Sequence, residues 1–132
     1  MPVKSNPAHW RDPRHRWGLK GELVAMQFLE RRGWQVLEHR FRMGRAEVDL
    51  VVRKGGLVAF VEVKTRRSAR FGKPVEAVGW AKQREMHRVA SAWMDRFGLP
   101  GDVYRFDVIG VMLSKQRLKV EHIKDAFWPG WR

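Results

Sequence analysis

The sequence predicts an α/β domain in which helices flank a mixed β-sheet, and three observations support this fold class. Apolar residues recur at helical spacing in two segments, residues 18–32 and 74–97. Short runs rich in Val, Leu and Phe lie between and after these segments, as β-strands would. A Gly-Gly pair joins two of the runs and is typical of a hairpin turn. The predicted order of elements is therefore α-β-β-β-α-β-β.

The first helix is predicted over residues 18–32. Its apolar face comprises Leu19, Leu23, Met26 and Leu29. Gly33 follows at the position where a left-handed C-terminal cap belongs. The preceding residues 1–17 are rich in Pro and basic residues and show no hydrophobic period, so we expect a flexible basic arm there.

The second helix should run from about Pro74 to Phe97, because Pro stands near its start and Gly98 directly follows its end. Its apolar face comprises Val78, Met86, Val89, Trp93 and Phe97. The other predicted segments are a strand at 34–41, two hairpin strands around 55–56, strands at 104–112 and 117–123, and an aromatic tail at 126–132. These elements form one domain, expected over residues 18–125.

The composition indicates a polyanionic partner. The chain has 132 residues, enough for one domain with its own core, and 27 Lys and Arg against 14 Asp and Glu give a net charge of +13. Nucleic acid and anionic lipid both match that charge. No uncharged apolar run approaches the roughly 20 residues of a membrane span, and no apolar signal segment opens the chain, so we expect a cytoplasmic protein. The absence of Cys excludes disulfides and thiolate metal sites.

The hairpin carries acidic residues where strands usually carry Val or Thr. If the Gly-Gly pair is a two-residue turn, Asp49 stands opposite Glu62 and Glu47 opposite Lys64. The reverse side is then apolar and holds Val48, Leu50, Val52, Ala59, Val61 and Val63. Opposed side chains have Cβ atoms about 5 Å apart, so the four charged residues form one patch.

Two carboxylates that oppose each other destabilise a sheet unless they share a proton or a cation lies between them. A hard divalent cation such as Mg²⁺ prefers such oxygen ligands. Lys64, two residues after Glu62 on the same face, could hold an attacking water or neutralise charge on a phosphate. The alternative is a solvated sheet face whose charges point outward, as antiparallel sheets allow.

These residues resemble the core of the PD-(D/E)XK nuclease superfamily: Asp49, a 12-residue gap, then Glu62-Val63-Lys64. Longer segments resemble the YraN-like family of predicted endonucleases, itself similar to archaeal Holliday junction resolvases. They are GLKGELVAMQFLERRGW, EVDLVV, FVEVKTR, FGKPVEAV, AKQ and YRFDVI, within about residues 18–110. One position departs from the family pattern, because Ala46 stands where Gly usually precedes the Glu.

The resemblance implies a restriction-endonuclease-like sandwich and a metal-dependent nuclease. In this chain Asp49 and Glu62 would bind Mg²⁺ or Mn²⁺ with help from the Val63 carbonyl, and Lys64 would be the catalytic amine. The resemblance also singles out Glu22, Glu47 and Lys82, and it includes Gln83 in the AKQ segment, so that Glu47 and Gln83 are candidate accessory residues.

Glu22 and Lys82 each have a structural alternative. Glu22 shares a helix face with Met26 and Leu29, so its carboxylate needs a partner. It could serve the metal site, or it could simply be a first-turn acid that the helix dipole stabilises. Lys82 could clamp a phosphate or extend along the surface of the second helix. We expect Asp107 and Arg105 to form a structural pair.

A basic segment follows Lys64 directly. Its candidate phosphate-binding residues are Arg66, Arg67, Arg70 and Lys73. They could bind phosphates beside the scissile bond without reading sequence, or they could be a solvated loop. Trp17 and Trp128 lie in segments where stacking on bases is conceivable, although packing on the domain is the simpler expectation.

The sequence therefore favours a metal-dependent endonuclease acting on nucleic acid, with structured or branched DNA as the expected substrate. The first alternative is a nucleic-acid-binding module that keeps the fold without turnover, and the second is a structural protein that binds RNA through charge. Cutting both strands of a duplex requires two sites, so we expect a homodimer, with the tail at 126–132 as a candidate interface.

Overall fold

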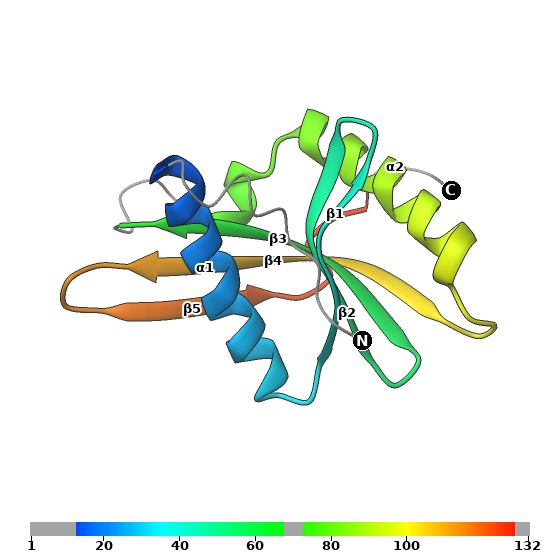
Figure 1. Ribbon diagram of the computed structural model, residues 1–132, viewed down its shortest axis with the longest axis horizontal. Coiled ribbons are helices and arrows are strands. Elements are labelled where there is room, and N and C mark those ends of the chain that lie inside the picture. The colour runs from blue at the N-terminus through cyan, green and yellow to red at the C-terminus, as the bar shows by residue number, and fades with distance from the viewer. Residues whose placement is uncertain (1–12, 68–72, 129–132) are drawn as a thin grey trace.

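The computed structural model describes residues 13–67 and 73–128 and has the predicted order of helices and strands (Figure 1). Five strands form one sheet in the order β1-β2-β3-β4-β5, in which β3 and β4 are parallel and the other neighbours antiparallel. The strands are β1 (Gln35–Met43), β2 (Ala46–Lys54), β3 (Leu57–Arg66), β4 (Val103–Leu113) and β5 (Leu118–Ile123). Helices α1 (Pro13–Glu30) and α2 (Trp80–Phe97) flank the sheet, which confirms the predicted mixed-sheet α/β sandwich.

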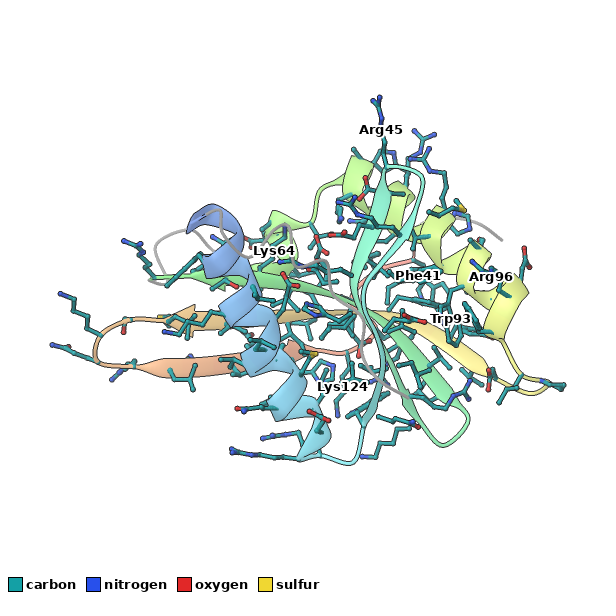
Figure 2. The ribbon with its side chains drawn as sticks, in the orientation of Figure 1. Phe41, Arg45, Lys64, Trp93, Arg96 and Lys124 are labelled. Carbon is teal, nitrogen blue, oxygen red and sulfur yellow. The ribbon has the colours of Figure 1, made fainter. Side chains whose placement is uncertain are left out.

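Each face of the sheet has its own apolar core. The α1-side core packs Ala25 and Leu29 against Leu50 and Val61. The α2-side core is larger, and Figure 2 labels Phe41 and Trp93 within it. Its other main members are Val51, Phe60, Met86, Val89, Phe106 and Val108. Because β3 is buried on both of its faces, its sequence is an almost continuous run of apolar residues.

Both helices differ from the prediction at their starts. Helix α1 begins at Pro13, inside the expected basic arm, where the fixed φ of proline suits the first helical turn. The predicted second helix is divided: the 3-10 helix η3 (Pro74–Ala77) comes first, and α2 begins only at Trp80 after the extended Gly79. The predicted cap at Gly33 is confirmed, because its φ is +90°.

Helix α1 lies unusually close to β3. A Cβ atom added at Gly21 would overlap the side chain of Thr65, so only glycine allows this approach. The next residue, Glu22, is carried with the helix toward the sheet. Gly18, one turn earlier, has ordinary contact distance around its missing Cβ, the nearest atom being Glu22 Oε2 at 3.6 Å.

The described part of the aromatic tail packs on its own domain. The ring of Phe127 stacks on Phe106 with centroids 5.4 Å apart, and Ala126 donates a backbone hydrogen bond to the Phe106 carbonyl. Trp128 touches the edge of the same ring and remains 41% exposed. The tail from 129 to 132 and the arm from 1 to 12 lie outside the described residues. No helix within residues 13–67 and 73–128 is long and apolar enough to cross a membrane.

We expect Gly21→Ala to lower the melting temperature, because the added methyl forces α1 away from Thr65. Overpacking of this kind typically destabilises by about 1 to 3 kcal/mol. Ala in a helix normally stabilises by up to about 1 kcal/mol relative to Gly, so a net loss identifies the close approach. Gly18→Ala is the matched control and should leave stability unchanged or raised. Thermal unfolding of both variants decides the matter, and an equal gain in both would contradict the contact.

Candidate active site

The two acids predicted to bind metal lie together where β2 and β3 separate. The paired register between these strands ends at Leu50 and Val61, so Asp49 and Glu62 are the first residues beyond it. Asp49 Oδ2 accepts a hydrogen bond of 2.7 Å from the backbone amide of Val63. The side chain of Glu62 is 5% exposed. Lys82 of α2 lies 3.7 Å from Glu62 at this level, and the charge of Glu22 on α1 acts on Asp49.

Burial raises the pKa of Asp49 well above its usual range. The negative charge of Glu62 raises it further, as does the charge of Glu22. The Val63 amide opposes this rise without reversing it. The pair therefore needs a proton or a cation to remain in place, as expected for closely opposed acids.

Glu62 offers one oxygen to a ligand. Its Oε2 lies 3.5 Å from Lys64 Nζ and 3.7 Å from Lys82 Nζ. Its Oε1 is buried and accepts no hydrogen bond. A buried carboxylate oxygen without a partner loses its solvation without compensation, so the site favours a bound proton donor or cation at Oε1.

Glu22 reaches the same region from α1, but both of its oxygens are occupied. Its Oε1 lies 2.6 Å from His39 Nε2 and accepts a 2.8 Å hydrogen bond from Arg40 Nε. A second Arg40 nitrogen donates to Oε2 at 3.3 Å. Burial raises the pKa of Glu22, but its bonds to His39 and Arg40 outweigh burial and leave the pKa below its ordinary value. Glu22 is thus a charged partner of Arg40 beside the acid pair.

Arg40 is a site residue that sequence reasoning missed. Its φ of +59° is rare for a residue other than glycine and interrupts the side-chain alternation of β1. Consecutive strand residues normally point to opposite faces, yet His39 and Arg40 both contact Glu22. By the register of its neighbours, Arg40 stands opposite Asp49. Bonds to Glu22 raise the pKa of Arg40, with smaller contributions from Glu47 and Asp49.

The alternation of β2 breaks at the same level. Val48 belongs to the α2-side core, whereas Leu50 belongs to the α1-side core. The expectation of one continuous apolar face along the hairpin is therefore wrong. Val48 and Leu50 are two residues apart and would lie on the same face of a regular strand. They point to opposite faces because the backbone turns between them, at Asp49. The sequence of β1, QVLEHRFRM, is polar at five of its nine positions and gives no signal that singles out Arg40.

Lys82 lies in the site, whereas Glu47 points elsewhere. Lys82 Nζ donates to the Glu47 carbonyl at 2.9 Å and to Glu85 at 2.7 Å. Burial lowers the pKa of Lys82, but nearby Glu62 and Glu85 outweigh it and raise the pKa above its ordinary value. The Glu47 carboxylate pairs with Arg42 across the β1–β2 hairpin at 2.7 Å, instead of facing Lys64 as the register predicted. That prediction is wrong because β2 and β3 no longer pair at this level.

The other candidate residues make contacts of their own. Gln83 donates to the Val78 carbonyl and so fixes the turn before α2. Arg67 stacks on Trp17, Lys73 is exposed, and Arg70 lies outside the described residues. Asp107 forms the expected pair with Arg105 at 2.9 Å and also contacts His122 at 2.7 Å. Within the described part of the chain no three His, Asp or Glu side chains are arranged to hold a metal, so a cation would need backbone or water oxygens besides Asp49 and Glu62.

Comparison with known sequences places the chain among relatives of unassigned activity. The model of the uncharacterised protein family UPF0102 matches residues 21–111. A UPF0102 protein of Alkaliphilus metalliredigens is 44% identical over 110 residues, covering 83% of this chain and 96% of that protein. One from Chlorobium chlorochromatii is also 44% identical, over 117 residues, covering 84% of this chain and 90% of that protein. These matches confirm the resemblance at the level of the family.

A solved structure, SfsA of Pyrococcus furiosus in complex with Ca²⁺, is similar with a TM-score of 0.39 and 10% identity. The similarity covers 86% of this chain and 64% of the SfsA chain. At this TM-score the similarity carries no argument about the site.

We expect Asp49→Asn to stabilise the metal-free protein by about 0.5 to 1 kcal/mol, because it removes one of two adjacent carboxylates. The folded-state pKa of Asp49 is raised, so its charge destabilises the fold only above the unfolded-state pKa near 4. The gain should therefore vanish below about pH 4, grow as pH rises from there toward the folded-state pKa of Asp49, and stay constant above it.

The same variant should lose any Mg²⁺-induced rise in melting temperature. Asp95→Asn removes an exposed acid from α2 and serves as the control for net charge. Thermal melts across pH, with and without Mg²⁺, test both expectations. A metal response that persists in Asp49→Asn would contradict the assignment.

Proposed function

The chain belongs to the uncharacterised protein family UPF0102, and we propose that it is a metal-dependent endonuclease that hydrolyses phosphodiester bonds of nucleic acid. The observation that carries this proposal is the acid pair with its unsatisfied oxygen. Asp49 and Glu62 lie together with raised proton affinity at Asp49, and Glu62 Oε1 has no partner. Structured or branched DNA is the substrate we favour.

The residues present fit a hard divalent cation. Asp49 and Glu62 would hold Mg²⁺ or Mn²⁺, with the Val63 carbonyl as a third oxygen ligand. When bound, such an ion polarises a phosphate and lowers the pKa of a bound water. Binding would also remove the repulsion between the two acids and give Glu62 Oε1 a partner, which is the physical reason to expect a cation here.

Two lysines supply positive charge beside the acid pair. Lys64 is 30% exposed and its amine lies 3.5 Å from Glu62 Oε2, so it can hold a water or a phosphate oxygen while it stays close to the pair. Lys82 is bound to the Glu47 carbonyl and to Glu85, so it neutralises Glu62 from a fixed position. We therefore assign Lys64 to catalysis and Lys82 to electrostatic support of the acid pair.

The Glu22–Arg40 pair would act on the acids rather than on the substrate. Both groups are nearly buried, with Arg40 6% and Glu22 9% exposed at their side chains. The Arg40 charge faces Asp49 and lowers the repulsion among the three acids of the region. We assign Arg40 and Glu22 a positioning role.

A nucleic acid substrate agrees with the charge of the chain. The net charge of +13 provides a sequence-independent attraction to phosphate that weakens with salt. Arg66, the last residue of β3, lies two residues beyond Lys64 on the same side of the strand and so places a cation near the acid pair. Phosphates flanking the scissile bond could bind there.

A nucleic-acid-binding module without turnover is the second candidate. The observation that favours it concerns Glu22, because both of its carboxylate oxygens already bind His39 or Arg40. Only Asp49 and Glu62 then remain available as carboxylate ligands for a metal. The two candidates predict the same binding and differ only in metal-dependent cleavage.

We expect Glu62→Gln and Lys64→Ala each to reduce Mg²⁺- or Mn²⁺-dependent DNA cleavage by about 10² to 10⁴-fold, as typical for loss of such groups. DNA affinity in Ca²⁺ should change little, because neither residue supplies most of the basic surface. Lys119→Ala removes an exposed lysine from β5 and is the matched control.

The assay compares cleavage of branched, duplex and single-stranded DNA with binding of the same molecules. Full activity in Glu62→Gln would refute the assigned site. Binding without cleavage of any substrate by the unmodified protein would favour the module.

A further inference from the structure

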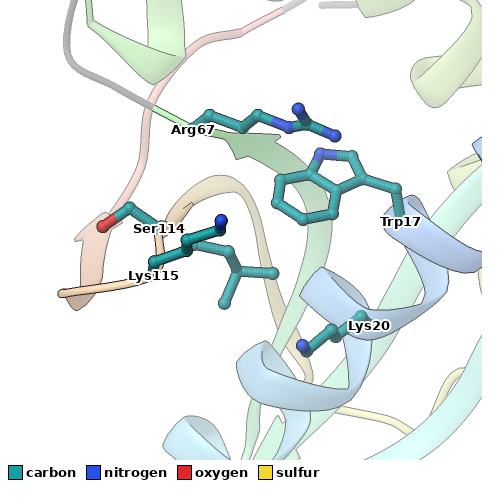
Figure 3. A pocket seen from close by; sticks show the side chains of 6 residues that line it. Trp17, Lys20, Arg67, Ser114 and Lys115 are labelled. Atoms are coloured by element: carbon teal, nitrogen blue, oxygen red, sulfur yellow. The ribbon is translucent and has the colours of Figure 1, made fainter.

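A cavity lies apart from the acid pair, between the start of α1 and the ends of β3 and β4 (Figure 3). Its volume is about 510 Å³. It is lined by Trp17, Lys20, Arg67, Leu113, Ser114 and Lys115. Among the described residues, the lining combines three cations, an indole and a hydroxyl group, and it includes no acidic residue.

The geometry of this cavity suits a stacked ring with an attached anion. The guanidinium of Arg67 lies 5.0 Å from the centre of the Trp17 ring, which orients two planar groups at one wall. Figure 3 shows the amines of Lys20 and Lys115 on the other sides of the same space. A nucleotide has both required parts, because its base stacks on aromatic and guanidinium planes and its phosphate pairs with lysine.

The cavity and the acid pair occupy different faces of β3. Val63 belongs to the α1-side core, and Thr65 meets α1 at Gly21. Arg67 contacts Trp17 and so also lies on the α1 side, whereas the alternation of β3 places Glu62 and Lys64 on the opposite face. At about 3.3 Å per residue, Arg67 is roughly 16 Å along the strand from Glu62. A nucleic acid strand leaving the acid pair toward the end of β3 would therefore reach the cavity within a few nucleotides.

The position of the cavity walls depends on the same contact that places Glu22. Gly21 allows α1 to lie against Thr65, and Trp17 and Lys20 precede it by four residues and one residue on that helix. The arrangement is therefore set by backbone packing and does not rest on surface lysines alone.

We propose that this cavity binds an unpaired nucleotide of the substrate, with its base against Trp17 and Arg67 and its phosphate between Lys20 and Lys115. The assignment of a single-stranded extension as part of the substrate rests on the proposed nuclease function. The binding itself requires neither metal nor cleavage, so it is measured separately from catalysis.

The test compares DNA duplexes with and without a short single-stranded tail, bound to the full chain in EDTA. We expect the tailed duplex to bind about tenfold more tightly than the blunt duplex, since a stacked base contributes an effect of that order. Trp17→Ala should abolish this preference and leave blunt-duplex affinity unchanged. Trp17→Phe should retain part of it, and Trp80→Ala, which removes a 63% exposed indole from α2, should retain all of it.

Lys115→Glu provides a second test in an exposed position where folding should not depend on the side chain. It should also reduce the preference for the tail.

In ¹⁵N spectra, the indole signal of Trp17, identified by its loss in Trp17→Phe, should shift with the tailed duplex and not with inorganic phosphate. Equal affinity for tailed and blunt DNA would overturn the proposal, as would a tail preference that survives in both Trp17→Ala and Lys115→Glu. A Trp17 shift produced equally by phosphate would also overturn it, because the site would then bind only an anion. Absence of cleavage leaves this result untouched and bears only on the nuclease function.

Discussion

The repulsion between two adjacent carboxyl groups, Asp49 and Glu62, is the constraint around which the local structure is organised. Burial withdraws water from both groups and raises the pKa of Asp49, so neither charge is screened as it would be in solvent. Lys64 and Lys82 compensate on one side, and Arg40 on the other. The compensation is incomplete, since one buried oxygen of Glu62 remains without a partner. A protein that needed only a stable sheet would place Val or Thr at these positions.

The backbone departs from regular β-structure at the level of this pair. In β1, Arg40 has a left-handed backbone conformation. In β2, the apolar side chains change from one face of the sheet to the other at Asp49, and the pairing of β2 with β3 extends only as far as the neighbouring Leu50. Helix α1 approaches β3 through Gly21 and brings Glu22 into contact with Arg40. Local strain of this kind is usually found where a site requires it. Here it directs side chains from several elements toward a single pair of acids.

Much of the fold could be predicted from the sequence, because hydrophobic period, the Gly-Gly turn and the caps are local signals. The proximity of Asp49 to Glu62 followed from counting residues across the turn. The contact of Glu47 with Arg42 and the switch of faces between Val48 and Leu50 did not follow, because both depend on where paired strands separate. Arg40 was missed for a similar reason: a positive φ at an arginine is imposed by tertiary contacts and leaves no local signature. The start of α1 at Pro13 was missed because residues 13–17 show no hydrophobic period.

Whether the acid pair takes a divalent cation is the central claim, and anomalous diffraction from crystals soaked in Mn²⁺ tests it most directly. The account predicts one peak between Asp49 and Glu62, within coordination distance of Glu62 Oε1, together with its loss in crystals of the Asp49→Asn variant. Crystals of the unmodified protein that show no peak at this position at neutral pH, with the two carboxyl groups still in contact, would contradict it. The acids would then be held by a shared proton, and the metal-dependent chemistry proposed for this site would have no ligand set.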